Sequence, residues 1–225
     1  MEQQIHSILS GAKCFLWDFD GCFADTERLH YFAYKHAFER FGHAIPEESY
    51  YPSFTHLGDG TRREILTNHL SVSEEDISLI KAEEYGRLIA VGPVNCFSET
   101  IHLVRLMRSR GAKVAIASNS SEQEIKTVLS TAGFPIGELD LIVGKQAGLR
   151  KKPEPDIFLH ALEKLALSRE DAVVLEDSNR GLMAAAAAQC RAVWIRTSYN
   201  AGLESCEPHV ASLTHAELLK LMRGL

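Results

Sequence analysis

Carboxylates stand in close pairs at two places in the sequence where an apolar run ends. Asp18 and Asp20 follow the run CFLW and are themselves followed by Gly21, and Glu176 and Asp177 follow the run AVVL. Ionised carboxylates are costly to bury without partners, so each pair needs a cation or hydrogen-bond donors nearby. Side chains two residues apart in an extended segment point the same way, so Asp18 and Asp20 can face one site.

Two further segments offer a hydroxyl group and a cation. Ser118 and Asn119 follow the apolar run KVAIA, where a strand is predicted to turn into a helix whose N-terminus favours an anion. Lys152 lies in RKKPEPD, whose two prolines restrict the backbone around it. Each segment also has an ordinary structural explanation, as a helix cap for Ser118 or Asp177 and as a solvated loop for RKKPEPD. Together the four segments supply hard oxygen ligands for Mg²⁺ and cationic and N–H donors for a phosphate group.

The elements that must position these residues are short apolar strands alternating with helical patterns. Buried strands rich in Val, Ile and Leu are predicted at residues 14–18, 113–117, 139–143, 172–175 and 192–195. Helix signals between them are the capping box Ser121 to Glu124, the helix ends Gly133 and Gly111, a start at Ser98 and Pro155 in a first turn. Strands that alternate with helices pair in parallel through right-handed crossovers, so the sequence predicts a doubly wound α/β sheet.

One segment breaks this alternation. Residues 27–91 have helical periodicity in LHYFAYKHAFERFG, TRREILTNHL and SEEDISLIKAEEYGRLIA, and no strand pattern stands out among them. We therefore expect an α/β core made of residues 1–26 and 92–225, with a helical domain of residues 27–91 inserted after the first strand. Such an insert would lie over the carboxyl end of that strand, where open α/β sheets bind ligands.

Composition excludes several classes of partner. The 225 residues carry 24 basic against 30 acidic side chains, a formal charge of -6 without a long basic run, which argues against a nucleic-acid surface. No apolar stretch reaches the ~20 residues of a membrane span, and MEQQIHSILSG lacks the features of a secretory signal. The five cysteines are scattered and odd in number, as expected for reduced thiols. We expect a cytoplasmic monomer or small homo-oligomer that binds neither nucleic acid nor membranes.

The four segments, taken in order, resemble a known family. The pattern DxDGxxxD, then Ser-Asn after a strand, then KPxPDxF, then EDSxxG is similar to the haloacid dehalogenase superfamily, and within it to the phosphatases close to β-phosphoglucomutase. The resemblance covers nearly the whole chain, including a helical cap between the first and second motifs. It implies a Rossmann-like core with a cap, Mg²⁺ as cofactor and a small phosphorylated metabolite as substrate.

The resemblance also implies a role for each matching residue. Asp18 is expected to be the nucleophile that takes the phosphoryl group as an aspartyl-phosphate. Asp20 is expected to be the general acid and base, and must then retain a proton near neutral pH, which a neighbouring carboxylate and partial burial would promote. The implied remaining roles are metal binding by Asp18, the backbone carbonyl of Asp20, Glu176 and Asp177, phosphate binding by Ser118 and Asn119, and charge balance by Lys152.

Substrate choice is expected to depend on the cap. His30, in DTERLH, lies where many cap-bearing relatives also have histidine, and HLGDGTRRE resembles a cap loop that leans toward the substrate, with Arg62 or Arg63 as a contact. The alternative for these residues is a solvated helix surface. Lys81 and Tyr85, in KAEEY, are interpreted as part of a charge-rich solvated face.

The chain departs from the family pattern at two turns. Cys22 and Phe23 replace the usual Thr-Leu or Val-Leu after DxDG, which leaves the acid intact and bears on the cap hinge. Gln189 and Cys190 replace the usual Gly-Met after the Ala-rich helix, and Gln tolerates a left-handed helix end less well than Gly.

The function expected from these residues is a Mg²⁺-dependent phosphatase acting on a sugar or polyol phosphate. The alternative is a β-phosphoglucomutase-type mutase, which uses the same residues and differs in how well the closed cap excludes water. A non-catalytic phospho-receiver or binding module is a third hypothesis, but receivers are shorter, lack a helical insert after the first strand and carry their phosphorylated Asp after a later strand.

Overall fold

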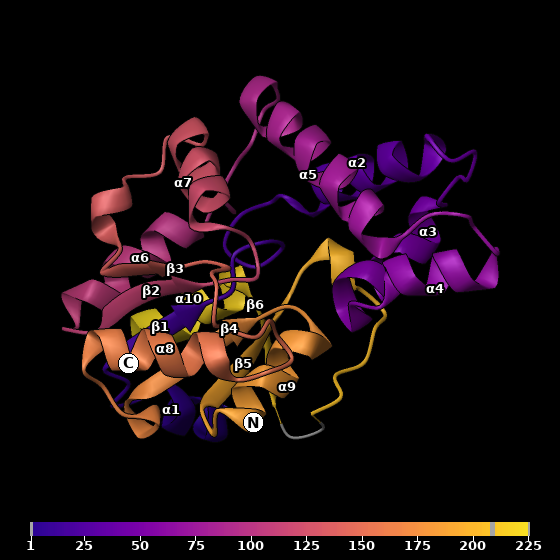
Figure 1. The fold of residues 1–225 in the computed structure, drawn as a ribbon. Coiled ribbons are helices and arrows are strands. Elements are labelled where there is room, and N and C mark those ends of the chain that lie inside the picture. Colours follow the sequence, from indigo (N-terminus) through magenta and orange to yellow (C-terminus); the bar gives the residue numbers. More distant parts are fainter. Residues whose placement is uncertain (1, 208–209, 225) are drawn as a thin grey trace.

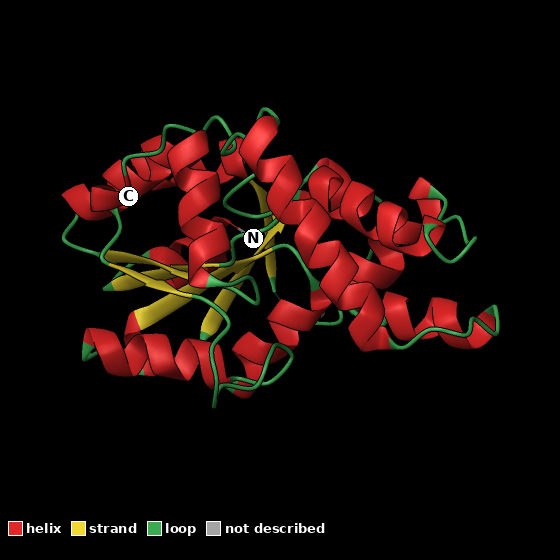
Figure 2. Cartoon of the chain, turned by 45° about the horizontal axis from the view of Figure 1, so that its top comes forward, coloured by secondary structure: helices red, strands yellow, loops and turns green. Residues whose placement is uncertain are grey.

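The computed structural model describes residues 2–207 and 210–224, and a parallel β-sheet forms its centre (Figures 1 and 2). Its six strands are β1 (Cys14–Trp17), β2 (Lys113–Ala117), β3 (Leu141–Val143), β4 (Ala172–Glu176), β5 (Arg191–Arg196) and β6 (Ala211–Thr214). They lie in the order β3-β2-β1-β4-β5-β6, and every neighbouring pair is parallel. The predicted doubly wound sheet is confirmed, and the order places β1 in its middle.

Helices cover both faces of this sheet (Figure 1). One face packs against α1 (Glu2–Leu9), α6 (Thr100–Ser109), α7 (Glu122–Thr131) and α10 (His215–Gly224). The other packs against α8 (Asp156–Leu165) and α9 (Asn179–Ala187). Successive strand residues point to opposite faces, so Phe15 and Trp17 join the first layer while Cys14 and Leu16 join the second. The all-apolar strand β1 is thereby buried on both sides, as parallel sheets require.

Every element between residues 27 and 91 is helical, as predicted, and the segment lies beyond the carboxyl ends of the strands (Figure 1). Its elements are α2 (Glu27–Glu39), α3 (Glu47–Tyr50), the π-helix η1 (Tyr51–Leu57), α4 (Gly60–Thr67) and α5 (Glu74–Val91). The segment has its own apolar cluster around Phe38, Tyr50 and Ile77. Short 3₁₀ turns elsewhere are η2 (Ile136–Glu138), η3 (Arg169–Asp171) and η4 (Ser198–Asn200).

The boundaries of several elements differ from those predicted. The first strand ends at Trp17, the third starts at Leu141 rather than at residue 139, and β6 was not predicted. Helix α6 begins at Thr100 and not at Ser98, whose hydroxyl instead hydrogen-bonds the side chain of Glu99. Helix α8 begins one residue after Pro155, which is its N-cap.

Two local predictions about helix ends can be compared directly with the backbone. The capping box at the start of α7 is present, because the Ser121 hydroxyl accepts a hydrogen bond from the Glu124 N–H and the Glu124 carboxylate accepts one from the Ser121 N–H. After α9 the chain takes a left-handed turn at Gln189, with φ of 57°. The turn therefore forms without the usual glycine.

No helix in residues 2–207 and 210–224 is long and apolar enough to cross a membrane. The cysteines Cys14, Cys22, Cys96, Cys190 and Cys206 are all free thiols, as the sequence predicted.

Candidate active site

The four predicted segments meet at the carboxyl edge of the sheet. Asp18 follows β1, Ser118 follows β2 and Asp177 follows β4, and because β1 lies between β2 and β4 these strand ends are adjacent. Lys152 reaches the same place from the loop before α8. They line a cavity of about 40 Å³, whose wall consists of Asp18, Asp20, Glu27, Thr55, Ser118, Asn119, Lys152, Asp177, Ser178 and Arg180.

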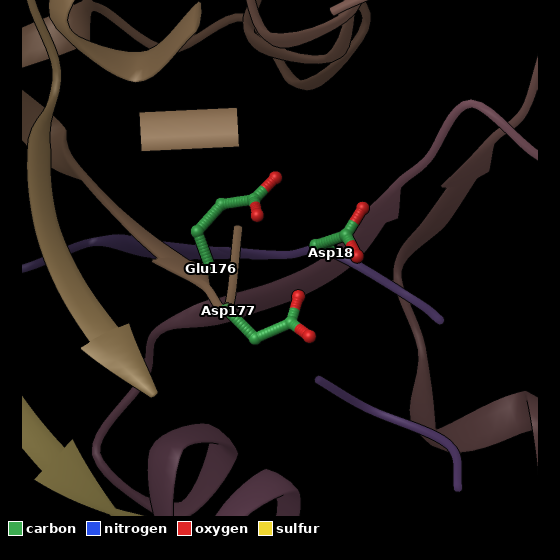
Figure 3. A group of neighbouring side chains, drawn as sticks. All are labelled: Asp18, Glu176 and Asp177. Carbon is green, nitrogen blue, oxygen red and sulfur yellow. The ribbon is translucent and has the colours of Figure 1, made fainter. Parts of the chain in front are cut away.

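Three buried carboxylates form a cluster in this site (Figure 3). Oxygen atoms of Asp18, Glu176 and Asp177 all lie within 4.8 Å of one another. Both carboxylate oxygens of Asp177 are buried without a hydrogen-bond partner in the described structure. Burial and the neighbouring carboxylates raise the pKa of Asp177 well above its usual range, and burial and Glu176 raise the pKa of Asp18 to about 7. Clustered hard oxygen donors, two of them unpartnered, fit a divalent ion such as Mg²⁺.

Two glycines make room for these carboxylates. Gly21 has φ of +77°, and a Cβ built there would lie 2.4 Å from Oδ2 of Asp177. A Cβ at Gly181 would lie 1.8 Å from Oε1 of Glu176. The turn predicted at Gly21 is therefore present, and the missing side chain also lets the backbone approach the cluster.

Lys152 neutralises part of the negative charge. Its side chain is buried, and Nζ donates to Oδ1 of Asp18 at 2.5 Å and to Oε1 of Glu176 at 2.6 Å. Burial alone would lower the pKa of Lys152, but the charges of Asp18 and Glu176 outweigh it and raise that pKa above its usual range. A lysine that stays charged beside a carboxylate lowers the repulsion an incoming phosphate would meet.

Asn119 holds this lysine in place. Its Oδ1 accepts a hydrogen bond from the Lys152 N–H at 3.0 Å, and its Nδ2 donates one to the Lys152 carbonyl oxygen at 3.5 Å. Ser118 is buried in the same turn, where its hydroxyl accepts a hydrogen bond from the N–H of Ser120 at 3.1 Å. Both predicted phosphate-binding residues thus lie in the cavity wall, and the side-chain amide of Asn119 is occupied by the backbone of Lys152.

The protonation predicted for Asp20 needs correction. Its Oδ1 accepts hydrogen bonds from Thr26 at 2.6 Å and from His30 at 2.9 Å, and its Oδ2 accepts one from Ser120 at 2.5 Å. Burial alone would raise the pKa of Asp20, but the charge of His30 and these donors bring it below the usual range. The donors come from Thr26, from His30 of helix α2 and from the loop after β2, and they favour the ionised form of Asp20 in this conformation. Its side chain is also not part of the three-carboxylate cluster.

His30 and Tyr85 come to the site together from the helical segment. Their rings are stacked with centroids 4.0 Å apart, and the Tyr85 hydroxyl lies 3.4 Å from Oδ1 of Asp20. The prediction of a solvated face was wrong for Tyr85, which is fully buried, with Nζ of Lys81 placed 4.6 Å above its ring. His30 hydrogen-bonds Asp20 and does not itself line the cavity.

Arg62 is exposed on α4 and does not line the cavity. The helical side of the cavity consists instead of Glu27 and Thr55, with Arg180 from α9 beside them. Oε2 of the buried Glu27 accepts a hydrogen bond from the Thr55 hydroxyl at 2.5 Å. No sequence pattern singles out Glu27 or Arg180, because an acid or an arginine in the first turn of a helix is ordinarily solvated.

With this geometry established, the chain can be compared with known proteins. It matches the haloacid dehalogenase-like hydrolase family over residues 15–195 and therefore belongs to that family. Protein CbbY of Rhodobacter capsulatus is 29% identical over 199 residues, which cover 84% of this chain and 88% of that protein. The phosphorylated carbohydrates phosphatase of Thermotoga maritima is 26% identical over 210 residues, covering 90% of this chain and 94% of the relative.

Solved structures of similar fold include members of the same family. The crystal structure of CbbY from Rhodobacter sphaeroides in complex with phosphate has a TM-score of 0.78 and 28% identity, covering 92% of this chain and 96% of that one. A mutant of the same protein was crystallised with xylulose-(1,5)bisphosphate, with the same TM-score and identity. The expected family, and with it the expected class of phosphomonoester hydrolase, is confirmed.

Proposed function

We propose that this protein is a Mg²⁺-dependent phosphatase that hydrolyses a small sugar or polyol phosphate through an aspartyl-phosphate on Asp18. The observation that carries the proposal is the environment of Asp18, whose carboxylate lies between the cation of Lys152 and the unpartnered oxygens of Asp177. The phosphatase of Thermotoga maritima and the phosphate complex of CbbY support this substrate class.

The proposed attacking atom is Oδ2 of Asp18. Lys152 binds Oδ1, so Oδ2 is left to form the bond to phosphorus while the bond from phosphorus to the leaving oxygen breaks. Mg²⁺ held by Asp18, Asp177, Glu176 and the Asp20 carbonyl would offset the charge of the transferring group. Lys152, the Ser118 hydroxyl and the backbone N–H of Asn119 would bind and orient the same group.

Asp20 is proposed as the general acid and then the base. The leaving oxygen needs a proton, and Asp20 shares a hydrogen bond with His30 from which that proton can come. Asp20 must turn away from Thr26, His30 and Ser120 before it can reach the leaving group. After the leaving group departs, the same carboxylate takes a proton from the water that attacks the aspartyl-phosphate.

Residues 27–91 are proposed to act as a cap domain over the core of residues 1–26 and 92–225. The cavity of about 40 Å³ has room for roughly three water molecules at 10–15 Å³ each, far less than a sugar phosphate occupies. Substrate entry therefore requires the helical segment to separate from the core, and its return would exclude bulk water.

The proposal is tested by phosphate release from a panel of sugar and polyol phosphates, with Mg²⁺ and with EDTA. We expect metal-dependent release that falls about 1000-fold or more in Asp18→Asn. Glu83→Gln, which changes an exposed carboxylate on α5, should retain full activity. Metal-independent release, or full activity of Asp18→Asn free of deamidation, would contradict the mechanism. With β-glucose 1-phosphate we expect free phosphate, and glucose 6-phosphate would indicate the mutase instead.

A further inference from the structure

Arg180 is an unpaired cation in the wall of the active-site cavity. It lies in the first turn of α9, three residues after Asp177, and is half-buried. Its Nε is buried without a hydrogen-bond partner, and among the described residues Arg180 has neither a hydrogen bond nor an ion pair. The buried Nε–H has lost water and gained no partner, which carries an energetic cost that a ligand can offset.

The surroundings of Arg180 place it on the helical side of the cavity. Gly58, at the end of η1, has φ of +78°, and a Cβ built there would lie 2.5 Å from Nη1 of Arg180. The backbone of the helical segment thus passes directly over the guanidinium group. Glu27 lines the same cavity, and burial raises its pKa while the charge of Arg180 acts in the opposite direction. Its Oε2 is occupied by Thr55, and it forms no ion pair with Arg180 in the described chain.

The transferred phosphoryl group has its own binding groups at the ends of strands β1 and β2 and in the loop before α8. These are Lys152 and the turn after Ser118, next to the carboxylate cluster. Arg180 lies instead where the remainder of a substrate must extend, beside Thr55 and Gly58. A guanidinium group offers paired N–H donors whose geometry matches a carboxylate or a phosphate.

We propose that Arg180 binds a second anionic group, a carboxylate or a phosphate, on the leaving-group part of the substrate. This inference rests on the proposed phosphatase function and narrows its substrate class to phosphate esters with two anionic groups. Arg180 then acts as a specificity residue for the reaction and takes no part in breaking the phosphorus–oxygen bond.

The test compares matched substrates that differ in one anionic group. The pairs are 3-phosphoglycerate with glycerol 3-phosphate, and fructose 1,6-bisphosphate with fructose 6-phosphate. For at least one pair we expect the wild-type protein to have the higher kcat/KM for the doubly anionic member. Arg180→Gln should lower that value about 10- to 100-fold, mainly through KM, and leave the other member almost unchanged. Arg110→Gln removes an exposed arginine at the end of α6 and should change neither.

Two further variants distinguish the effect of the positive charge at residue 180 from the effect of where its side chain lies. Arg180→Lys keeps the charge without the fork of donors and should restore part of the preference. Gly58→Ala should reduce the preference by displacing the guanidinium group. An equal loss on both members of each pair in Arg180→Gln, or an unchanged preference, would overturn the inference while leaving the phosphatase intact. Absence of phosphate release by the wild-type protein from every ester would instead overturn the proposed function.

Discussion

At the scale of single residues, the site depends on the space that Gly21 leaves beside Asp177. A side chain at this position would face two obstacles, a left-handed backbone and a carboxylate oxygen 2.4 Å from the new Cβ. Gly42 has nearly the same backbone, with φ of +74°, but no atom lies within 4 Å of its Cβ position. Comparing substitutions at the two glycines therefore distinguishes the effect of backbone strain from the effect of displacing Asp177.

We expect Gly42→Ala to lose about 1 kcal/mol of unfolding free energy from the left-handed conformation. Gly21→Ala should lose more, because its Cβ would also overlap Oδ2 of Asp177 and Cγ of Glu27. Only Gly21→Ala should also lose phosphatase activity, because its new methyl group pushes Asp177 out of the carboxylate cluster. Thermal unfolding and phosphate release measure the two effects separately. Equal activity in the two variants would show that the position of Asp177 does not limit the reaction.

The residues of the core motifs could be predicted from the sequence, but the protonation of Asp20 and the burial of Tyr85 could not. Asp18, Lys152 and Asp177 meet as expected because each directly follows a strand or enters the loop beside one. The ionised state of Asp20 depends on His30, a partner from the helical segment whose orientation no local pattern specifies. The prediction of a solvated face was wrong for Tyr85 for the same reason, because its ring is buried in a stack against His30.

At the scale of elements, the strands that position the site were the most predictable part of the fold. Strands β1, β2 and β4 are short apolar runs, and burial on both faces leaves no other place for them. Strand β6 lies at the sheet edge with the sequence ASLT, only half-buried for the most part, and so carries too weak a pattern to predict. Gln189 shows that tertiary packing can impose a left-handed turn on a residue that does not favour it.

Helix α10 is joined to the loop after β1 by His215. The buried Nε2–H of this ring donates to the carbonyl oxygen of Cys22 at 2.6 Å, and the ring stacks on Phe97. Burial lowers the pKa of His215 below its usual value despite that hydrogen bond. The unfolded state, with a histidine pKa of about 6.5, therefore binds more protons than the folded state as the pH falls below neutrality.

The stability that neutral His215 contributes is complete above about pH 6.5 and is lost as the pH falls through the lower pKa of the folded state. We expect His215→Gln to make the change in melting temperature between pH 7.5 and pH 5.5 less negative than in the wild-type protein. The total change also contains opposite contributions from Asp18 and Asp177, because their raised pKa values stabilise the folded state as the pH falls. His102→Gln, an exposed histidine of α6, should leave it unchanged. The same slope in wild type and His215→Gln would mean that this ring does not contribute.

At the scale of the whole molecule, the core and the helical segment each supply one side of the cavity. The core contributes the three carboxylates and Lys152, while the helical segment contributes Glu27, Thr55 and the His30 ring that hydrogen-bonds Asp20. A further contact between the two parts is that of the Tyr51 and Tyr199 rings, which are tilted with centroids 5.2 Å apart. The cavity of about 40 Å³ therefore has walls from both parts of the chain.

The carboxylate cluster also couples metal binding to global stability. Asp18, Glu176 and Asp177 are buried with a single lysine among them, so the folded protein without a divalent ion has carboxylate charge that is only partly compensated. An ion that binds the folded state alone stabilises it by about 2.7 kcal/mol at 100 times its Kd. For a chain of this size that corresponds to a rise in melting temperature of roughly 5–10 °C.

We expect saturating Mg²⁺ to raise the melting temperature of the wild-type protein by this amount over its value in EDTA. Asp177→Asn should abolish the rise without lowering the melting temperature in EDTA, because it removes a buried carboxylate that has no hydrogen-bond partner. Glu83→Gln, on the exposed face of α5, should keep the full rise. Differential scanning calorimetry measures all three proteins, independently of substrate and turnover. A rise of the same size in Asp177→Asn would place the ion elsewhere in the molecule, and no rise in the wild-type protein would contradict a metal site formed by this cluster.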